Sequence, residues 1–141
     1  MLELVFVITI LGLLASIALP RFAATRDDAI VVKYRAQVAA IRSGIALQKS
    51  RRILESAAGG IYPPALDSGG TRLFNYGDGN TSNILETPYF VDASRKDGWT
   101  KAGNTYTLKL GALGSVDFTY NSATGSFSCN RAIANCKKLI D

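Results

Sequence analysis

The chain has 141 residues, 48% hydrophobic and 19% charged, with a formal net charge of +5. This length leaves about 120 residues for one small domain once an apolar segment at the start is set aside. There is no histidine, so the commonest general base and metal ligand is missing. No acidic pair stands in a catalytic motif either. The sequence therefore argues against an enzyme, and we expect neither a catalytic residue nor a metal site nor a cofactor.

Residues 1–20 are apolar apart from Glu3, Thr9 and Ser16. As a helix they would measure roughly 29 Å, close to the thickness of a bilayer's hydrocarbon core. A soluble domain of this size does not need a helix that is apolar all round, so the segment is expected in a membrane or in a bundle of equivalent helices. Glu3 has no cation nearby, since the first basic side chain is Arg21. Its carboxylate should therefore find a partner on another copy of the chain, or else lie among lipid headgroups.

Two further residues of this segment carry structural information. Gly12 stands four residues before Ser16, a spacing that allows two helices to approach closely, although scattered small residues on a lipid-facing helix would look the same. Pro20 removes a backbone hydrogen bond. Because a helical pattern resumes directly after it, Pro20 predicts a kink rather than a helix end.

Residues 21–56 predict the second half of the same helix, because they contain few breakers and many good helix formers. Eight basic residues stand against three acids between Arg21 and Glu55. Apolar residues recur every three or four positions and predict one buried stripe; they are Ile30, Tyr34, Val38, Ile41 and Ile45.

Residues 57–83 differ in composition, with glycine and proline pairs that exclude a long regular element. Embedded apolar side chains such as Leu66 and Phe74 predict a packed connecting loop rather than a free linker. Asp78 and Asn80 resemble part of a calcium loop, but the glycine and the terminal glutamate of that loop are missing, so calcium is not expected.

Residues 84–141 alternate apolar and polar side chains, which predicts strands. The expected strands are Tyr89–Val91, Thr105–Leu110, one around Val116, Phe118 and Tyr120, and Gly125–Asn130. Residues 111–115 and 121–125 would form the turns between them. We therefore expect an α+β fold in which an antiparallel sheet of three or four strands packs on the helical stripe.

The start of the chain matches a known pattern. Residues 3–8, 11–15 and 17–20 strongly resemble the N-terminal helix of type IV pilins and of type II secretion pseudopilins, with glutamate, glycine and proline in register. The resemblance implies a subunit held in the bacterial inner membrane and then drawn by the pilus assembly machinery into a helical filament of identical subunits. It implies assembly roles for Glu3, Gly12 and Pro20. Glu3 would neutralise the N-terminal amine of a neighbouring subunit, and residues 12–20 could lose helical order in the filament.

The sequence departs from this pattern at its start. Family precursors carry a short basic leader, which is cut before a residue that becomes N-methylated. No leader is present here, and two residues precede Glu3 where the family has four. We therefore expect a mature form lacking its first two residues, or a mis-assigned start, and Met1 is not expected to be the true N-terminus.

The two cysteines, Cys129 and Cys136, cannot complete a zinc site without histidine. A close pair near the end of an exported domain predicts a disulfide that ties the C-terminal tail to the last strand; two buried free thiols are the alternative. The resemblance places this domain outside the cell. The basic flank after residue 20 would indicate a cytoplasmic domain by the positive-inside rule, and the cysteines favour the resemblance.

The resemblance thus implies a pilin fold: a long kinked N-terminal helix (1–20 and 21–56), a variable connecting loop (57–83) and a sheet with a disulfide loop (84–141). The expected function is the major pilin of a type IV-like pilus, in a filament outside the cell. One alternative is the major pseudopilin of a type II secretion system, which Asp97-x-Trp99 resembles in part; the other is a membrane-tethered binding domain that does not polymerise. Nucleic acid is not expected as the main partner, because most basic residues lie on a helix that a filament would partly cover.

Overall fold

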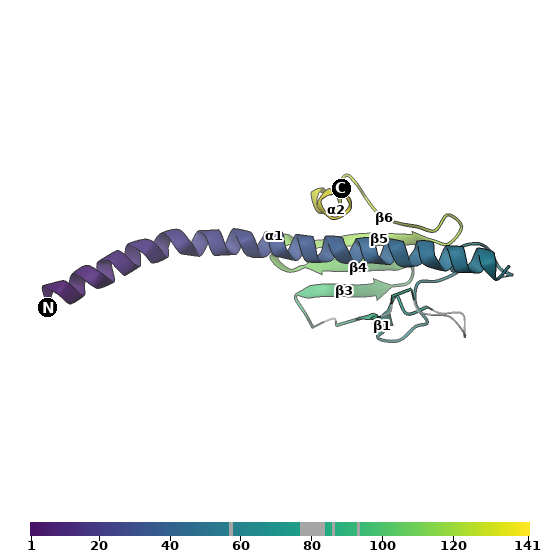
Figure 1. Ribbon diagram of the computed structural model, residues 1–141, viewed down its shortest axis with the longest axis horizontal. Coiled ribbons are helices and arrows are strands. Elements are labelled where there is room, and N and C mark those ends of the chain that lie inside the picture. Colours follow the sequence, from purple (N-terminus) through teal and green to yellow (C-terminus); the bar gives the residue numbers. More distant parts are fainter. Residues whose placement is uncertain (57, 77–83, 86, 93) are drawn as a thin grey trace.

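The computed structural model describes residues 1–56, 58–76, 84–85, 87–92 and 94–141, except for the side chains of residues 19–24. Helix α1 runs from Leu2 to Leu54, and the remaining elements gather along its second half (Figure 1). Its first half extends away from them, so the N-terminus lies far from every strand. Pro20, at which the sequence predicts a kink, lies outside the described side chains.

Helix α1 ends where the sequence changes from helix formers to glycine pairs. Arg51 and Arg52 stand in its last turn, where cations interact favourably with the C-terminal end of the helix dipole. The Glu55 amide donates to the Arg51 carbonyl, and the next residue, Ser56, takes a left-handed φ of 49°. A left-handed residue just after the last turn is a common helix stop.

The predicted α+β class is confirmed in its broad form, because a small antiparallel sheet lies against the helix (Figure 1). The sheet is four-stranded with the order β3-β4-β5-β6. Each strand pairs antiparallel with the next one along the chain. The bounds are Asp97–Ala102 for β3, Thr105–Leu110 for β4, Ser115–Asn121 for β5 and Ser126–Cys129 for β6. A short 3-10 turn, η1 (Gly111–Leu113), joins β4 to β5.

The alternation predicted for the strands is confirmed, since every second residue of β4 and β5 is buried. Tyr106 stands opposite Phe118, and Leu108 opposite Val116, so both strands present their apolar side chains on one face. That face packs on the helical stripe, where Tyr34, Val38, Ile41 and Ile45 are at most 3% exposed. Side-chain period 2 in the strands and period 3.6 in the helix thus bring two apolar surfaces into one core.

One glycine of α1 allows a close backbone approach. A Cβ at Gly44 would lie 2.2 Å from the carbonyl oxygen of Ile84 and 2.9 Å from its side chain. The segment after the connecting loop therefore crosses α1 at a distance that only glycine permits.

The connecting segment is packed rather than free. Leu66, Leu73 and Phe74 are at most 1% exposed, although Ile61 is 52% exposed. A small sheet that the sequence did not predict forms where β1 (Arg72–Leu73) pairs antiparallel with β2 (Tyr89–Phe90). The strand expected at Tyr89–Val91 thus belongs to this second sheet, and not to the main one. The two residues of β1 carry too little periodicity to be detected from sequence.

The C-terminal helix α2, Ala134–Ile140, was also not predicted. Seven residues are too few for a helix to be stable alone, so tertiary packing must hold it. Cys136 and Leu139 are its buried side chains, and α2 lies close to α1.

Candidate functional site

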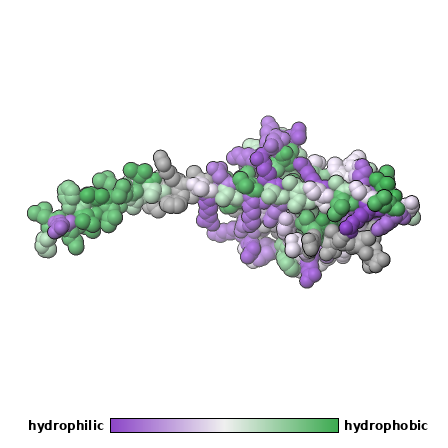
Figure 2. All heavy atoms as spheres, viewed as in Figure 1, coloured by the Kyte–Doolittle hydropathy of each residue, from purple (hydrophilic) through white to green (hydrophobic). Residues whose placement is uncertain are grey.

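The first part of α1 presents apolar side chains on all sides and buries none of them in this chain. Figure 2 shows the hydrophobic colour concentrated on this projecting part of the helix. Twelve large apolar side chains between Met1 and Ile17 are 46% exposed or more. We call the segment Met1–Ala18 the apolar rod. Its two hydroxyl groups bond back to the helix, because Thr9 donates to the Val5 carbonyl and Ser16 to the Leu13 carbonyl. The rod therefore offers an apolar surface with no hydroxyl left unpaired.

The predicted assembly residues lie on this rod or just after it. Glu3 is exposed in the first turn of α1, where a carboxylate is favourable at the positive end of the helix dipole. No ion pair joins it to another residue within the described chain. A Cβ added at Gly12 would touch nothing within 4 Å, so this glycine leaves an open notch. Pro20 lies outside the described side chains.

Among the residues that the structure describes, no helix combines the length and the apolar character needed to cross a membrane.

A second uncovered surface runs along the other half of α1. On the side opposite the core stripe, eight exposed and uncharged residues follow one another at alternating intervals of three and four. We call this set the outer seam: Ala29, Val32, Ala36, Ala39, Ser43, Ala46, Ser50 and Ile53. A repeat of 3.5 residues is the spacing at which two helices pack along a shared line. Most of its members are small, so another helix could approach closely. Sequence reasoning missed this seam because the larger residues of the core stripe dominate the periodicity.

The predicted disulfide is present. Cys129 at the end of β6 is bonded to Cys136 in α2, with 5.9 Å between their Cα atoms. The bond ties α2 to the sheet, as expected for a bridge between the C-terminal tail and the last strand. A loop this short contributes about 2.5 kcal/mol by the chain-entropy estimate.

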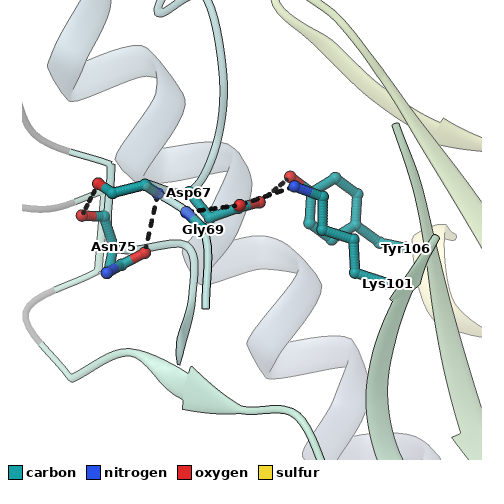
Figure 3. Close-up of polar contacts among 6 residues, drawn as sticks. Asp67, Gly69, Asn75, Lys101 and Tyr106 are labelled. Carbon is teal, nitrogen blue, oxygen red and sulfur yellow. Dashed lines mark hydrogen bonds and ion pairs between the residues drawn. The ribbon is translucent and has the colours of Figure 1, made fainter. Parts of the chain in front are cut away.

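The most polar buried cluster fastens the connecting segment to the sheet (Figure 3). The carboxylate of Asp67 points toward β3 and β4, and its side chain is 2% exposed. Lys101 Nζ lies 2.7 Å from its Oδ1, and the Tyr106 hydroxyl donates to its Oδ2 at 2.5 Å. The Gly69 amide also donates to Oδ1, at 3.2 Å.

The negative charge of Asp67 is balanced within this cluster. The Asp67 carboxylate has a cation beside it and two further donors, the partners that a buried carboxylate needs. Around it, Ser68 and Asn75 bond to each other across the turn, from the Ser68 amide to Asn75 Oδ1 and from the Ser68 hydroxyl to the Asn75 carbonyl. The Asp67 cluster thus fixes the connecting segment to the sheet.

Within the described part of the chain, no three histidine, cysteine or acidic side chains gather into a metal site. The calcium-loop resemblance at Asp78 and Asn80 falls in residues 77–83, outside the described residues.

Buried tyrosines make the domain sensitive to alkaline pH. Burial, together with the hydrogen bond to Asp97, raises the pKa of Tyr34 to about 12, and burial raises the pKa of Tyr120 to about 12. Burial and the bond to Asp67 also raise the pKa of Tyr106. In the unfolded chain these groups ionise near pH 10. Between these values the unfolded state binds fewer protons than the folded state, so stability must fall as pH rises.

We therefore expect the free energy of unfolding to hold steady below about pH 9 and to fall between about pH 10 and 12. Urea unfolding at a series of pH values would measure this. Tyr34→Phe cannot ionise, so its stability should fall less steeply over the same range. A wild-type stability that stays level up to pH 12 would contradict the prediction.

The chain matches no protein-family model, no curated protein and no solved structure.

Proposed function

We propose that this chain is the structural subunit of a type IV-like pilus, a major pilin that polymerises through its N-terminal helix into an extracellular filament. The observation that carries the proposal is that one helix bears two uncovered surfaces, the apolar rod, whose one charged side chain is Glu3, and the uncharged outer seam. The sequence resemblance of residues 3–20 to pilins and pseudopilins supports it. A kinked helix on a sheet, the pilin fold, is part of the proposal.

The two surfaces suit each other as parts of one heterologous contact. The helical part of the rod, from Leu2 to Ala18, is about 24 Å long and the seam from Ala29 to Ile53 about 36 Å, so a rod fits along a seam. A rod cannot fold back onto the seam of its own helix, so its partner must be a second copy. Repetition of such a head-to-tail contact gives an open fibre.

Burial of the rod supplies the driving force. Full burial of one large apolar side chain contributes about 1.5–3 kcal/mol. Twelve such side chains on the rod together exceed the roughly 4–15 kcal/mol that association costs. Lipid hydrocarbon would cover the same side chains, and we propose that the inner membrane holds the chain before the assembly machinery extracts it.

Glu3 would set the register of assembly. The free-energy cost of removing an unpaired carboxylate from water is far larger than the stabilisation that one buried methyl group provides. The Glu3 carboxylate would therefore need a cation from a neighbouring copy. The family resemblance implies that this cation is the N-terminal amine of that copy. A misplaced register would leave both charges unpaired.

We expect Glu3→Ala to leave the chain membrane-inserted but to stop efficient polymerisation. The measurement is negative-stain electron microscopy and sedimentation of full-length chain as detergent is removed. Glu55→Ala is the matched control, because Glu55 is an exposed glutamate at the other end of α1. If Glu3→Ala builds filaments in normal amounts, charge pairing is wrong. If the wild-type chain stays single under all assembly conditions, polymerisation itself is wrong and a membrane-tethered binding domain remains.

The second candidate is a major pseudopilin of a type II secretion system. Asp97 opens β3 and Trp99 is buried in the core, which suits the Asp-x-Trp segment that resembles the pseudopilins. The two functions share one architecture and differ in fibre length. Electron microscopy of cells that make the chain separates them, because a pilin yields long surface fibres and a pseudopilin does not.

A further inference from the structure

A cleft of about 390 Å³ opens where α1, β2 and β3 meet. This volume falls within the range of small-molecule sites, roughly 300–1,000 Å³. Its lining includes Tyr34 and Gln37 of α1, Phe90 of β2 and Trp99 of β3. None of its lining residues belongs to the apolar rod or to the outer seam, and the proposed polymerisation makes no use of it.

The charges of the cleft are paired with one another. Lys33 Nζ lies 3.7 Å from Asp97 Oδ2, and Arg95 Nε lies 3.5 Å from Asp92 Oδ2. The two cations and two anions that line the cleft therefore cancel. An ionic ligand would gain no net attraction there and would lose its hydration.

The aromatic rings do not form an open cage for a cation. Lys33 Nζ already lies 4.8 Å from the centre of the Tyr34 ring, and the Arg72 guanidinium 5.7 Å from the centre of the Phe90 ring. A cationic ligand would be repelled by these side-chain cations beside the two rings.

The polar groups of the cleft instead include both donors and acceptors. The side-chain oxygen of Gln37 accepts the Trp99 indole N–H at 2.9 Å, which leaves the amide NH₂ of Gln37 to donate. The carboxylates of Asp92 and Asp97 accept, and the Arg95 guanidinium donates. The side chains of Asp92, Asp97 and Arg95 are 44–72% exposed, so a ligand can reach them. Asp97 also accepts from the Tyr34 hydroxyl at 3.0 Å and Asp92 accepts from Ser94, but a carboxylate has further acceptor positions.

This combination matches a ring that has hydroxyl groups around its rim and C–H groups on its face. Each hydroxyl group both donates and accepts hydrogen bonds, so it can bond to donors and to acceptors of the cleft. The Phe90 ring, 62% exposed beside the cleft, offers an apolar surface to the C–H face.

We propose that this cleft binds a neutral saccharide unit. Phe90 would pack against the sugar ring, while Gln37, Arg95 and the two aspartates would bond its hydroxyl groups. The proposal is independent of polymerisation, since a single chain holds every residue of the cleft.

Trp99 reports on the cleft directly, because it is the only tryptophan in the chain. The full chain is titrated separately with glucose, galactose, mannose, N-acetylglucosamine and N-acetylgalactosamine in a polyoxyethylene detergent, which carries no sugar headgroup. We expect a saturable change in Trp99 fluorescence with at least one of them. Phe90→Ala and Arg95→Gln should each weaken that binding at least tenfold.

Arg131→Gln is the matched control. Arg131 is 73% exposed and pairs with Asp141 at 3.8 Å, much as Arg95 does with Asp92, but it lies outside the cleft. Its binding should stay within twofold of wild type. Far-ultraviolet circular dichroism confirms that each variant is folded. The absence of saturation with all five sugars, or tighter binding of tetramethylammonium, phosphate or a neutral tripeptide, would overturn the proposal.

Discussion

Phe74→Ala is expected to lower the free energy of unfolding by about 3–5 kcal/mol, the range typical of a large buried ring cut back to a methyl group. Phe74 is fully buried and joins the connecting segment to the sheet. Its ring stacks on Tyr106 with 5.0 Å between ring centres and meets Trp99 edge-on at 5.5 Å. It also contacts the rings of Tyr89 and Phe127. Removal of this ring leaves a cavity between four aromatic neighbours.

The backbone at Phe74 sharpens this prediction. Its φ is 61°, a left-handed conformation that is strained for a bulky residue and costs of the order of 1–3 kcal/mol. Glycine takes that conformation without strain. Phe74→Gly should therefore be no less stable than Phe74→Ala, although glycine is ordinarily the weaker residue.

Urea unfolding followed by Trp99 fluorescence measures both variants. Phe90→Ala is the control, because Phe90 is 62% exposed and should cost under about 1 kcal/mol. If Phe74→Ala costs no more than Phe90→Ala, the aromatic cluster does not hold the connecting segment.

Ala39→Glu is expected to abolish filament assembly and to leave the single chain as stable as wild type, within about 0.5 kcal/mol. Ala39 is exposed at the middle of the outer seam. Glutamate is a good helix former, and Arg35 and Arg42 stand one turn before and after it. The folded monomer therefore accepts the change. A rod docked on the seam does not, because its apolar side chains would remove the new carboxylate from water.

Ala102→Glu is the matched control. Ala102 is also exposed, but it lies at the end of β3, away from the seam. Sedimentation and electron microscopy should show normal filaments for Ala102→Glu and none for Ala39→Glu, with equal urea midpoints for both. Normal filaments from Ala39→Glu would exclude the seam as the docking surface and would leave the rod to pack elsewhere.

Both predictions depend on contacts that are not visible in the sequence. Phe74 stands in a stretch of turn residues, and its place at the centre of the aromatic cluster arises from strands that join the sheet more than twenty residues later. The outer seam consists mainly of alanine and serine, which every helix contains. It is defined as a surface only because the sheet covers the opposite side of α1.

The local sequence pattern was sufficient to predict an element where apolar residues recur regularly on one of its faces. The core stripe of α1, the alternating strands β4 and β5, and the turns around residues 111–115 and 121–125 follow from periodicity and turn residues, and the structure confirms them. The cysteine pair was predicted from spacing and the expected compartment, and its bond is present. Each of these features depends on residues that are close in the chain.

The sequence by itself therefore determined the periodic elements, the disulfide and the apolar start that resembles the pilins. Tertiary structure alone decided the rest: the β1–β2 pair, α2, the Asp67 cluster and the cleft beside Trp99. The physical reason is that these features depend on contacts between residues far apart in the chain. A two-residue strand, a seven-residue helix or a buried aspartate has no stability of its own, and each exists because distant segments meet it with matching hydrogen bonds and apolar surface.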